Sequence, residues 1–134
     1  AFGCKEVTRL KFKYGIGHAD EVIKFLPDDI ALTVDKEWAS MLRKKGYTVY
    51  LLPTPPAAPP WAMQKLRSYA NALIVNGTAF VPTFGDKAID DSALKVYEKA
   101  GYKAIGLESS YVVDVAGGGP HCLTKVYPDF TKND

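Results

Sequence analysis

The stretch "WASMLRKKGYTVYLLP", residues 38–53, has a pattern that recurs in "ALKVYEKAGYKAIGLE", residues 93–108. In each stretch a helix-like run reaches a Gly-Tyr pair, and a strand-like run follows that pair. Matched positions in the two helix-like runs, mostly apolar, recur at i, i+3, i+4 and i+7, which is the spacing of one helix face. The sequence therefore predicts two copies of one helix-strand unit.

The ends of the two expected helices carry typical capping residues. Asp35 and Asp90 stand where N-caps belong, since an aspartate side chain accepts hydrogen bonds from the free N–H groups of a first helical turn. Gly46 and Gly101 stand where the left-handed residue that ends a helix belongs. Both helices are therefore expected to have defined ends.

Short apolar runs precede the helices and predict strands over 29–34 and 78–84. Asn76-Gly77 separates the second of these runs from another apolar run, which is the strongest short-range signal for a β-hairpin. The first copy therefore reads β-α-β and the second β-β-α-β. The prolines of "PTPPAAPP", residues 53–60, predict an extended surface connection rather than a domain linker, because one copy is too small to hold its own core.

Both ends of the chain show the alternation that is typical of half-solvated strands, over 7–14 and over 121–127. The predicted fold class is therefore α/β, built from repeated units in one domain, with an incomplete unit at each end.

The composition excludes several classes of protein. The 134 residues are 47% hydrophobic and 24% charged, which fits one globular core and gives no sign of disorder. A net charge of +2 without long runs of like charge argues against a nucleic-acid or membrane-surface partner. No apolar stretch approaches the roughly 20 residues of a membrane span, and no signal-peptide pattern opens the sequence.

Cysteine and glycine spacing argue against a disulfide scaffold, a metal and a cofactor. Cys4 and Cys122 lie near opposite ends of the chain, and two cysteines do not make a disulfide framework. No paired His or Cys ligands have zinc spacing, and no glycine loop has the dinucleotide fingerprint. We therefore expect neither a metal nor a cofactor.

The two histidines limit the choice of a general acid or base. Strand alternation over 121–127 would direct His121 and Cys122 to opposite faces, so His121 is expected to be a poor partner for the cysteine. His18 is the better candidate, because Asp20 lies two residues on and shares its face if the segment is extended. The titratable imidazole of His18 and the carboxylate of Asp20 would then both lie within reach of one ligand.

Spacing alone also allows an ordinary structural interpretation of each candidate. His18 can close a glycine turn beside a solvated Asp20, and a free cysteine such as Cys122 is usually buried. Asn71 can be a turn residue at the start of a strand. The glycines before Cys122, Gly119 among them, can form a flexible turn or let the backbone approach a ligand closely. Both interpretations stay open at this point.

Taken together, the motifs resemble those of a known family. The segments "GIGHADEVIKFLPDD", "YANALIVNGTAFVPTFGD" followed by "DDSALKVYEKAGY", and "GGGPHCLTK" occur in this order in the guanidine-modifying enzymes of the pentein superfamily. The chain resembles agmatine deiminases and Porphyromonas-type peptidylarginine deiminases over almost its whole length. The resemblance implies a five-bladed α/β propeller of ββαβ units. Residues 1–134 would form about its C-terminal half, with two units plus partial end units.

The resemblance also implies a role for each candidate residue. Cys122 would be the nucleophile, His18 the general acid and base, and Asp20 a carboxylate that holds the guanidinium. Asn71 and Gly119 would lie at the substrate site. A further acidic residue of the family's site comes from the N-terminal half. The resemblance therefore implies that this half, or a second chain, completes the propeller and the site.

The expected reaction is hydrolysis of the guanidino group of agmatine or of free or peptidyl arginine, giving a ureido product and ammonia without a cofactor. One alternative is a non-catalytic half-domain that needs a partner chain. Another is a peptidase in which Cys122, His18 and Asn71 form a triad, although it leaves Asp20 without a role. Deiminases that resemble this chain are cytoplasmic or exported, and we favour the cytoplasm.

Overall fold

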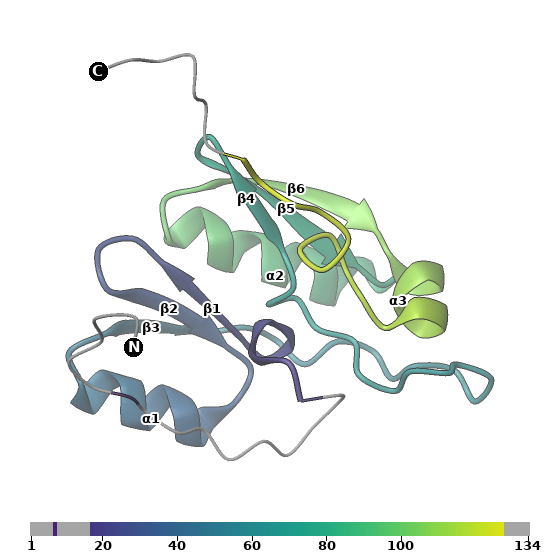
Figure 1. The fold of residues 1–134 in the computed structure, drawn as a ribbon, viewed down its shortest axis with the longest axis horizontal. Coiled ribbons are helices and arrows are strands. Elements are labelled where there is room, and N and C mark those ends of the chain that lie inside the picture. Colours follow the sequence, from purple (N-terminus) through teal and green to yellow (C-terminus); the bar gives the residue numbers. More distant parts are fainter. Residues whose placement is uncertain (1–6, 8–16, 128–134) are drawn as a thin grey trace.

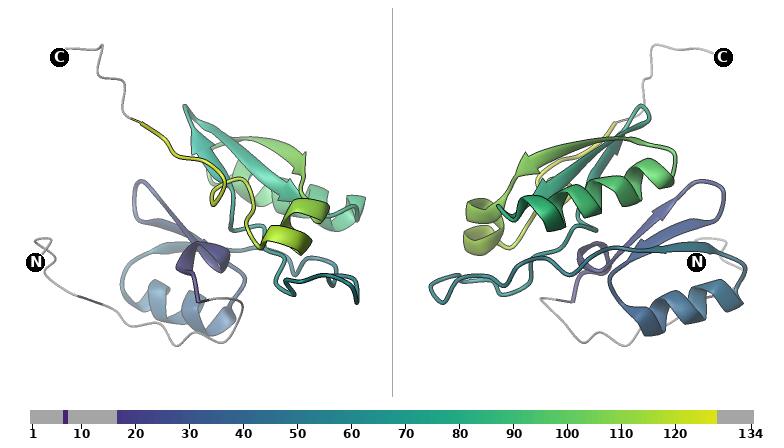
Figure 2. Two further views of the ribbon diagram at one scale, coloured as in Figure 1. Left: turned by 45° about the vertical axis from the view of Figure 1, so that its right-hand side comes forward. Right: turned by 180° about the vertical axis from the view of Figure 1, so that it is seen from behind.

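The computed structural model of the chain describes residue 7 and residues 17–127. These residues form a mixed α/β fold with two three-stranded sheets, each of which has one long helix (Figure 1, Figure 2). Two shorter helices, η1 (Ala19–Glu21) and α3 (Ser110–Ala116), lie before the first sheet and after the second. Within the described part of the chain, no helix is long and apolar enough to cross a membrane.

The first sheet is built in the order β-β-α-β. Its elements are β1 (Ile23–Leu26), β2 (Ile30–Thr33), α1 (Lys36–Lys44) and β3 (Thr48–Leu51). Strands β1 and β2 are antiparallel, whereas β2 and β3 are parallel, so α1 serves as the crossover between them. The residue pattern of the first copy predicts β2, α1 and β3, and the structure adds β1 to them.

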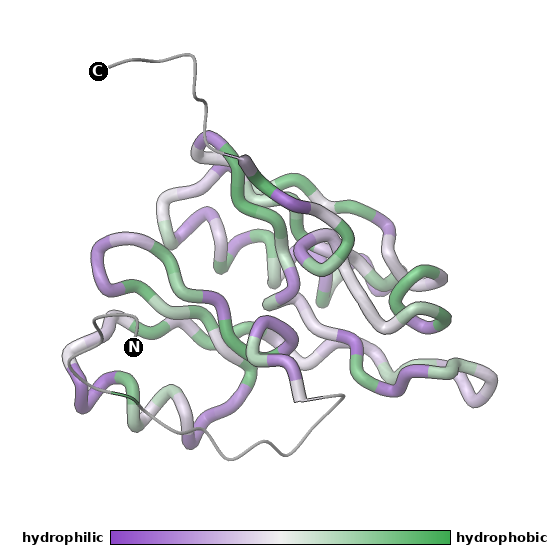
Figure 3. The backbone as a smooth tube through the Cα atoms, in the orientation of Figure 1, coloured by the Kyte–Doolittle hydropathy of each residue, from purple (hydrophilic) through white to green (hydrophobic). Residues whose placement is uncertain are grey.

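The second sheet repeats this order with β4 (Leu73–Val75), β5 (Thr78–Thr83), α2 (Lys87–Lys99) and β6 (Lys103–Glu108). Strand β4 is antiparallel to β5, and β5 is parallel to β6. The predicted hairpin is confirmed, because its two turn residues have positive φ angles of 47° and 73°. Strand β4 is hydrophobic along its length, whereas the tip of the β1–β2 hairpin is hydrophilic (Figure 3).

Most of the predicted helix caps are confirmed. The Asp35 side chain accepts hydrogen bonds from two N–H groups of the first turn of α1. Gly46 and Gly101 follow α1 and α2 with φ angles of 94° and 93°. The expectation for Asp90 is wrong, because α2 begins earlier in the sequence, directly after Asp86, whose side chain caps it. Asp90 therefore lies inside the helix and is buried.

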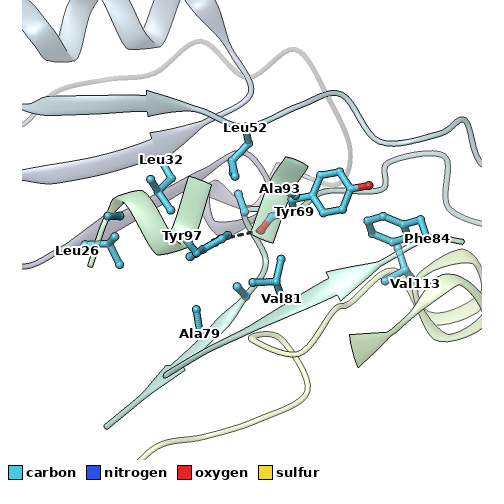
Figure 4. Packing of buried hydrophobic residues seen from close by; sticks show 13 residues of the cluster. Leu26, Leu32, Leu52, Tyr69, Ala79, Val81, Phe84, Ala93, Tyr97 and Val113 are labelled. Carbon is cyan, nitrogen blue, oxygen red and sulfur yellow. Dashed lines mark hydrogen bonds between the residues drawn. The ribbon is translucent and has the colours of Figure 1, made fainter. Parts of the chain in front are cut away.

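The two units share a hydrophobic core. The larger cluster of buried residues combines Leu26 and Leu32 from the first sheet with Val81 and Tyr97 from the second unit (Figure 4). A smaller cluster lies between α1 and the first sheet, with Trp38 among its members. Burial of apolar side chains from both units thus holds them together.

The connection between the units, residues 52–72, contains no helix or strand. Its proline-rich part, residues 53–60, has no regular element, as predicted (Figure 1). Arg67, farther along the connection, forms two hydrogen bonds of 2.9 and 2.7 Å with the Asp114 carboxylate on α3. The backbone N–H of Met63 also donates to the Asp114 carbonyl at 2.9 Å. These bonds fix the connection to α3.

The strands expected at the two ends of the chain have different outcomes. Of residues 7–14, only Val7 lies within the described residues, so that expectation falls outside them. The strand expected over 121–127 is wrong, because residues 121–123 form a turn and residues 124–127 have no regular element. The side chains of residues 121–127 are all exposed, so their alternation does not mark the face of a sheet.

Candidate active site

Three segments that are far apart in the sequence meet at the candidate site. Helix η1 carries Asp20, and the segment before β4 carries Asn71. The turn after α3 carries His121 and Cys122. Figure 2 shows η1, in purple, near the yellow segment that contains this turn. Asp20 and Cys122 are 102 positions apart in the sequence.

One carboxylate oxygen of Asp20 is close to three other side chains. Its Oδ2 lies 2.7 Å from His121 Nδ1, 2.9 Å from Asn71 Nδ2 and 3.2 Å from Cys122 Sγ. Asp20 is half-buried, whereas Cys122 is an exposed free cysteine. The interpretation of Cys122 as a buried structural residue therefore does not fit. The site combines an accessible thiol with a fixed anion.

Asn71 holds both the side chain and the backbone of the cysteine. Its Nδ2 donates to Cys122 Sγ at 3.0 Å, and its Oδ1 accepts from the Cys122 backbone N–H at 3.2 Å. The backbone carbonyl of Asn71 accepts from the His121 N–H, also at 3.2 Å. A single residue, Asn71, thus fixes the turn that carries the thiol.

The glycines before Cys122 allow this turn to approach Asn71. Gly117 ends α3 in the left-handed conformation, with a φ of 81°. A Cβ atom at Gly118 would lie 2.8 Å from the Cβ of Cys122, and one at Gly119 would lie 3.0 Å from Asn71 Oδ1. The backbone approaches a protein group closely here, and its approach to a ligand stays a prediction. The group approached here is Asn71 itself.

A buried network anchors the segment that carries Asn71. The Asp90 carboxylate accepts a hydrogen bond of 2.6 Å from Tyr69 Oη, and it accepts two more, of 3.0 and 3.1 Å, from backbone N–H groups just after β5. Tyr97 Oη donates to the Tyr69 carbonyl at 2.7 Å (Figure 4). Tyr69 stands two residues before Asn71, so this network fixes the backbone that leads to Asn71 and then to β4.

The histidines differ from the sequence expectations. His18 is exposed directly before η1 and makes no side-chain capping bond. The segment after it turns into η1, so the premise of an extended His18–Asp20 face is wrong. Among the described contacts, none joins the His18 ring to Asp20 or Cys122. His121, expected to point away from the site, instead contacts Asp20, because no strand forms there.

Lys24 on β1 is a neighbour of the site that the sequence analysis did not single out. The residue is only 8% exposed, and strand alternation places it on the same face as Leu26, which packs in the cluster shared by both units. Burial lowers the pKa of Lys24, although Asp20 and Cys122 both favour its charged form. The available signal was a single lysine within the apolar run of residues 22–26.

The thiol and the carboxylate have pKa values displaced in opposite directions. Burial acts to raise the pKa of Asp20, but hydrogen bonds from His121 and Cys122 outweigh it and hold that pKa below its ordinary value. Burial raises the pKa of Cys122, the Asn71 amide lowers it, and the Asp20 carboxylate raises it, with a net increase. In this state the carboxylate is ionised and the thiol tends to keep its proton.

The described residues include no group of three or more His, Cys, Asp and Glu side chains that could hold a metal ion. A cavity of about 360 Å³ lies beside the proline-rich connection, where Val22, Asp35 and Pro55 line it. None of its lining residues belongs to the group of Asp20, Asn71, His121 and Cys122. The candidate site is therefore separate from this cavity.

Comparison with known families identifies the chain. The family model described as Porphyromonas-type peptidyl-arginine deiminase matches residues 34–128, which is more than half of the chain. The chain belongs to the Porphyromonas-type peptidyl-arginine deiminase family. The match includes Asn71 and Cys122, whereas His18 and Asp20 lie before it.

Agmatine deiminases are among the similar sequences. The agmatine deiminase of Medicago truncatula is 35% identical over 115 residues, which are 84% of this chain and 28% of that protein. A putative agmatine deiminase of a Marinomonas species is 39% identical over 64 residues, which are 46% of this chain and 17% of that protein. The chain thus spans less than a third of the length of these relatives.

Solved structures support the same α/β fold. The putative arginine deiminase of Porphyromonas gingivalis has a TM-score of 0.68 and 26% identity, with 84% of this chain and 38% of that chain covered. For the C. jejuni agmatine deiminase, the TM-score is 0.65 at 24% identity, and the coverage is 78% and 36%. The two sheets of this chain therefore correspond to part of a larger fold.

Proposed function

We propose that this chain is part of a cysteine-dependent deiminase, which hydrolyses the guanidino group of agmatine or of an arginine residue to a ureido product and ammonia. The observation that carries the proposal is the exposed Cys122 thiol, 3.2 Å from the Asp20 carboxylate, in a member of this family. The names of the family and of the Medicago relative mention peptidyl-arginine and agmatine. Both share the guanidinium as the reacting group.

In the proposed complex, Asp20 binds the guanidinium. This group stays protonated at physiological pH, and its delocalised charge makes the central carbon a weak electrophile. An ionised carboxylate offers charge-assisted hydrogen bonds to its N–H groups and fixes the carbon for attack. The lowered pKa of Asp20 keeps that carboxylate ionised. Asn71 and Gly119 are proposed to lie at the substrate site. Asn71 Oδ1 accepts from the Cys122 N–H, and a Cβ at Gly119 would lie 3.0 Å from that oxygen.

The reaction then proceeds through the cysteine. The substrate's positive charge favours the Cys122 thiolate, which forms a C–S bond with the guanidinium carbon. His18 protonates the departing amine, so that a C–N bond breaks, ammonia leaves and a covalent thiouronium remains. His18 then takes a proton from water, which attacks the same carbon and releases the thiolate and, after loss of a proton, the ureido product. His18 is exposed beside η1, where a substrate and water have access to it.

The remaining part of the site is proposed to come from outside this chain. The chain covers 28% of the Medicago relative and 38% of the Porphyromonas gingivalis structure. A further carboxylate from the missing part, or from a second chain, would clamp the other side of the guanidinium. The chain would then supply about a third of a five-bladed α/β propeller, by the length of these relatives.

A second candidate function is a non-catalytic half-domain that assembles with a partner chain. Large apolar side chains near α3 favour it, since Trp61, Met63 and Tyr111 are 62%, 75% and 71% exposed. A backbone hydrogen bond joins Met63 to Asp114 on α3, the helix that carries Tyr111. An apolar surface of this kind is typical of an interaction site.

The experiment that tests the proposal measures ammonia and ureido product from agmatine, free arginine and a blocked arginine peptide. Wild-type chain is compared with Cys122→Ala, and Cys4→Ser serves as the matched control for loss of the other cysteine. With the site completed by a second copy of the chain or by the remaining part of the protein, we expect ammonia from the wild type and from Cys4→Ser, and none above background from Cys122→Ala. Sedimentation of the same samples gives the oligomeric state of each.

Equal ammonia release from wild type and Cys122→Ala would refute catalysis by this thiol. A monomer with no turnover on any of the three substrates would favour the half-domain over an enzyme that acts alone. Cleavage of the peptide's amide bonds in place of ammonia release would support a peptidase instead.

A further inference from the structure

The side-chain amide of Asn71 is fully engaged with the protein. Its Nδ2 carries two hydrogens, and it lies 2.9 Å from Asp20 Oδ2 and 3.0 Å from Cys122 Sγ. Its Oδ1 accepts from the Cys122 backbone N–H at 3.2 Å. The backbone of Gly119 closes the space beside Oδ1, since a Cβ there would lie 3.0 Å away. An incoming substrate therefore meets no unused donor on this amide.

The amide is also held rigidly. Asn71 is 4% exposed, whereas Cys122 is exposed, so a buried donor faces an accessible sulfur. The orientation of the amide is determined by its neighbours, because one atom must accept from the Cys122 N–H and the other must donate to the Asp20 carboxylate. The anchoring of Tyr69 by Asp90 and Tyr97 fixes the backbone just before it.

We propose that Asn71 is a positioning residue for the Cys122 thiolate: its Nδ2–H donates to the sulfur and favours the ionised form, while its Oδ1 fixes the backbone of the cysteine. This role differs from the one that the family resemblance implies for Asn71, which is a residue at the substrate site. As a contribution to catalysis it rests on the proposed deiminase function. As a property of the thiol it is measurable without any substrate.

The physical reason is the charge on the sulfur. A hydrogen bond from an N–H group to a thiolate is charge-assisted and therefore stronger than the same bond to a neutral thiol. The bond thus shifts the ionisation toward the thiolate. Asp20 acts in the opposite direction, because its oxygen accepts the thiol hydrogen and its negative charge disfavours a second anion. The direction of each effect on the pKa of Cys122 agrees with this assignment.

The test measures the rate of alkylation of Cys122 by iodoacetamide as a function of pH. The chain contains two cysteines, so all variants carry Cys4→Ser, which leaves Cys122 as the reactive thiol. The rate follows the thiolate fraction. We expect Asn71→Asp and Asn71→Leu each to move the midpoint of the profile to higher pH. We expect each to lower the rate at neutral pH roughly threefold to tenfold, because a hydrogen bond to a charged group is lost.

The two variants distinguish loss of the Asn71 Nδ2–H donor from other effects of the substitution. Asn71→Asp has the same shape and keeps an oxygen for the Cys122 N–H, so the backbone of the turn stays fixed. Asn71→Leu removes the donor without adding a charge. Asn76→Asp makes the same chemical change at the exposed hairpin turn and is expected to leave the midpoint in place. Far-UV circular dichroism and thermal unfolding establish that each variant is folded.

An unchanged midpoint in folded Asn71→Asp would overturn the proposal. A shift in Asn71→Asp without one in folded Asn71→Leu would also overturn it, because the effect would then come from the added charge. If the midpoints shift as expected but no guanidino substrate is turned over, the proposed deiminase function fails and the role of Asn71 toward the thiol stands.

Discussion

The two ββαβ units have the same strand order but hold their site residues in different ways. In the first unit Asp20 lies in η1, before β1, and in the second unit Asn71 lies before β4. In the segment before β1, the Val22 carbonyl accepts a neutral hydrogen bond of 2.8 Å from Thr33 Oγ1. The segment before β4 is tied by the Asp90 carboxylate, which accepts three hydrogen bonds.

The backbone and the side chains make different contributions to the candidate site. The repeated order places an entry segment before the first strand of each sheet, and these two segments meet through the bond between Asn71 and Asp20. The chemistry of the site then depends on side chains that are not repeated, with a carboxylate in one unit and an amide in the other. The anchoring also differs, and this difference is measurable.

Removing the anchor of the second unit should give the largest effect. Asp90→Ala leaves the buried Tyr69 hydroxyl and two backbone N–H groups without their acceptor, so we expect the free energy of unfolding to fall by about 3 kcal/mol. Urea unfolding measures the change. The neighbouring Asp91→Ala is the matched control, because Asp91 is partly exposed and its ion pair with Lys87 lies at the surface. Equal losses of unfolding free energy in both variants would contradict the anchoring role of Asp90.

Removing the anchor of the first unit should cost less. Thr33→Val keeps the shape of the side chain but removes the donor to the Val22 carbonyl and the acceptor for the Asp35 N–H. We expect the free energy of unfolding to fall by about 1 to 2 kcal/mol. Thr48→Val on β3 is exposed and should have no resolvable effect in the same urea titration. A loss in Thr33→Val as large as that in Asp90→Ala would mean that the two units are anchored alike.

Lys24 lies on β1 of the first unit, whereas the corresponding strand of the second unit, β4, carries no charged residue. Its lowered pKa means that the unfolded chain binds more protons between that pKa and the ordinary value of 10.5. The free energy of unfolding should therefore rise with pH across that interval, and Lys24→Met should lack the rise. Loss of the nearby cation should also slow alkylation of Cys122 at neutral pH, because the thiolate loses a favourable charge. Lys95→Met, exposed on α2, should do neither.

Protonation of Asp20 at acid pH should produce the smallest of these changes in the free energy of unfolding. Its pKa in the folded chain lies below the ordinary value of 3.8, so its contribution to stability is present above 3.8 and is lost as the pH falls through the lowered value. The difference in free energy of unfolding between wild type and Asp20→Asn should therefore shrink as the pH is lowered. Urea titrations at several acid pH values would contradict this if the difference stayed constant.

Local signals explain which parts of the fold were predictable. The hairpin at Asn76-Gly77, the N-cap Asp35 and the glycines after both helices depend on neighbouring residues only, and all are confirmed. Asp90 failed as a cap because matching it to the first copy hid Asp86, an equally good capping residue nearer to β5. Sequence matching between copies assumes helices of equal length, whereas α2 is 13 residues long and α1 is 9.

The membership of the candidate site was predictable only in part, because His18 has no described contact with Asp20 or Cys122, whereas His121 contacts Asp20. The motifs singled out Asp20, Asn71 and Cys122, which the structure brings together. They did not indicate that His121 contacts Asp20, because alternation over 121–127 suggested a strand. The turn that forms there is determined by hydrogen bonds to Asn71, which lies about fifty residues earlier in the sequence. Such long-range contacts leave no signal in local spacing.

The separation of 102 positions between Asp20 and Cys122 has a consequence for how the protein is made. Closing a loop of this length is entropically costly, and such contacts form only after the intervening chain has been packed. During synthesis Asp20 and Asn71 leave the ribosome before Cys122, so a nascent chain can build both sheets while its thiol is still without neighbours. The hydrogen bonds that fix Cys122 thus become possible only after the residues of both sheets have been synthesised. A newly emerged thiol is open to oxidants until they form.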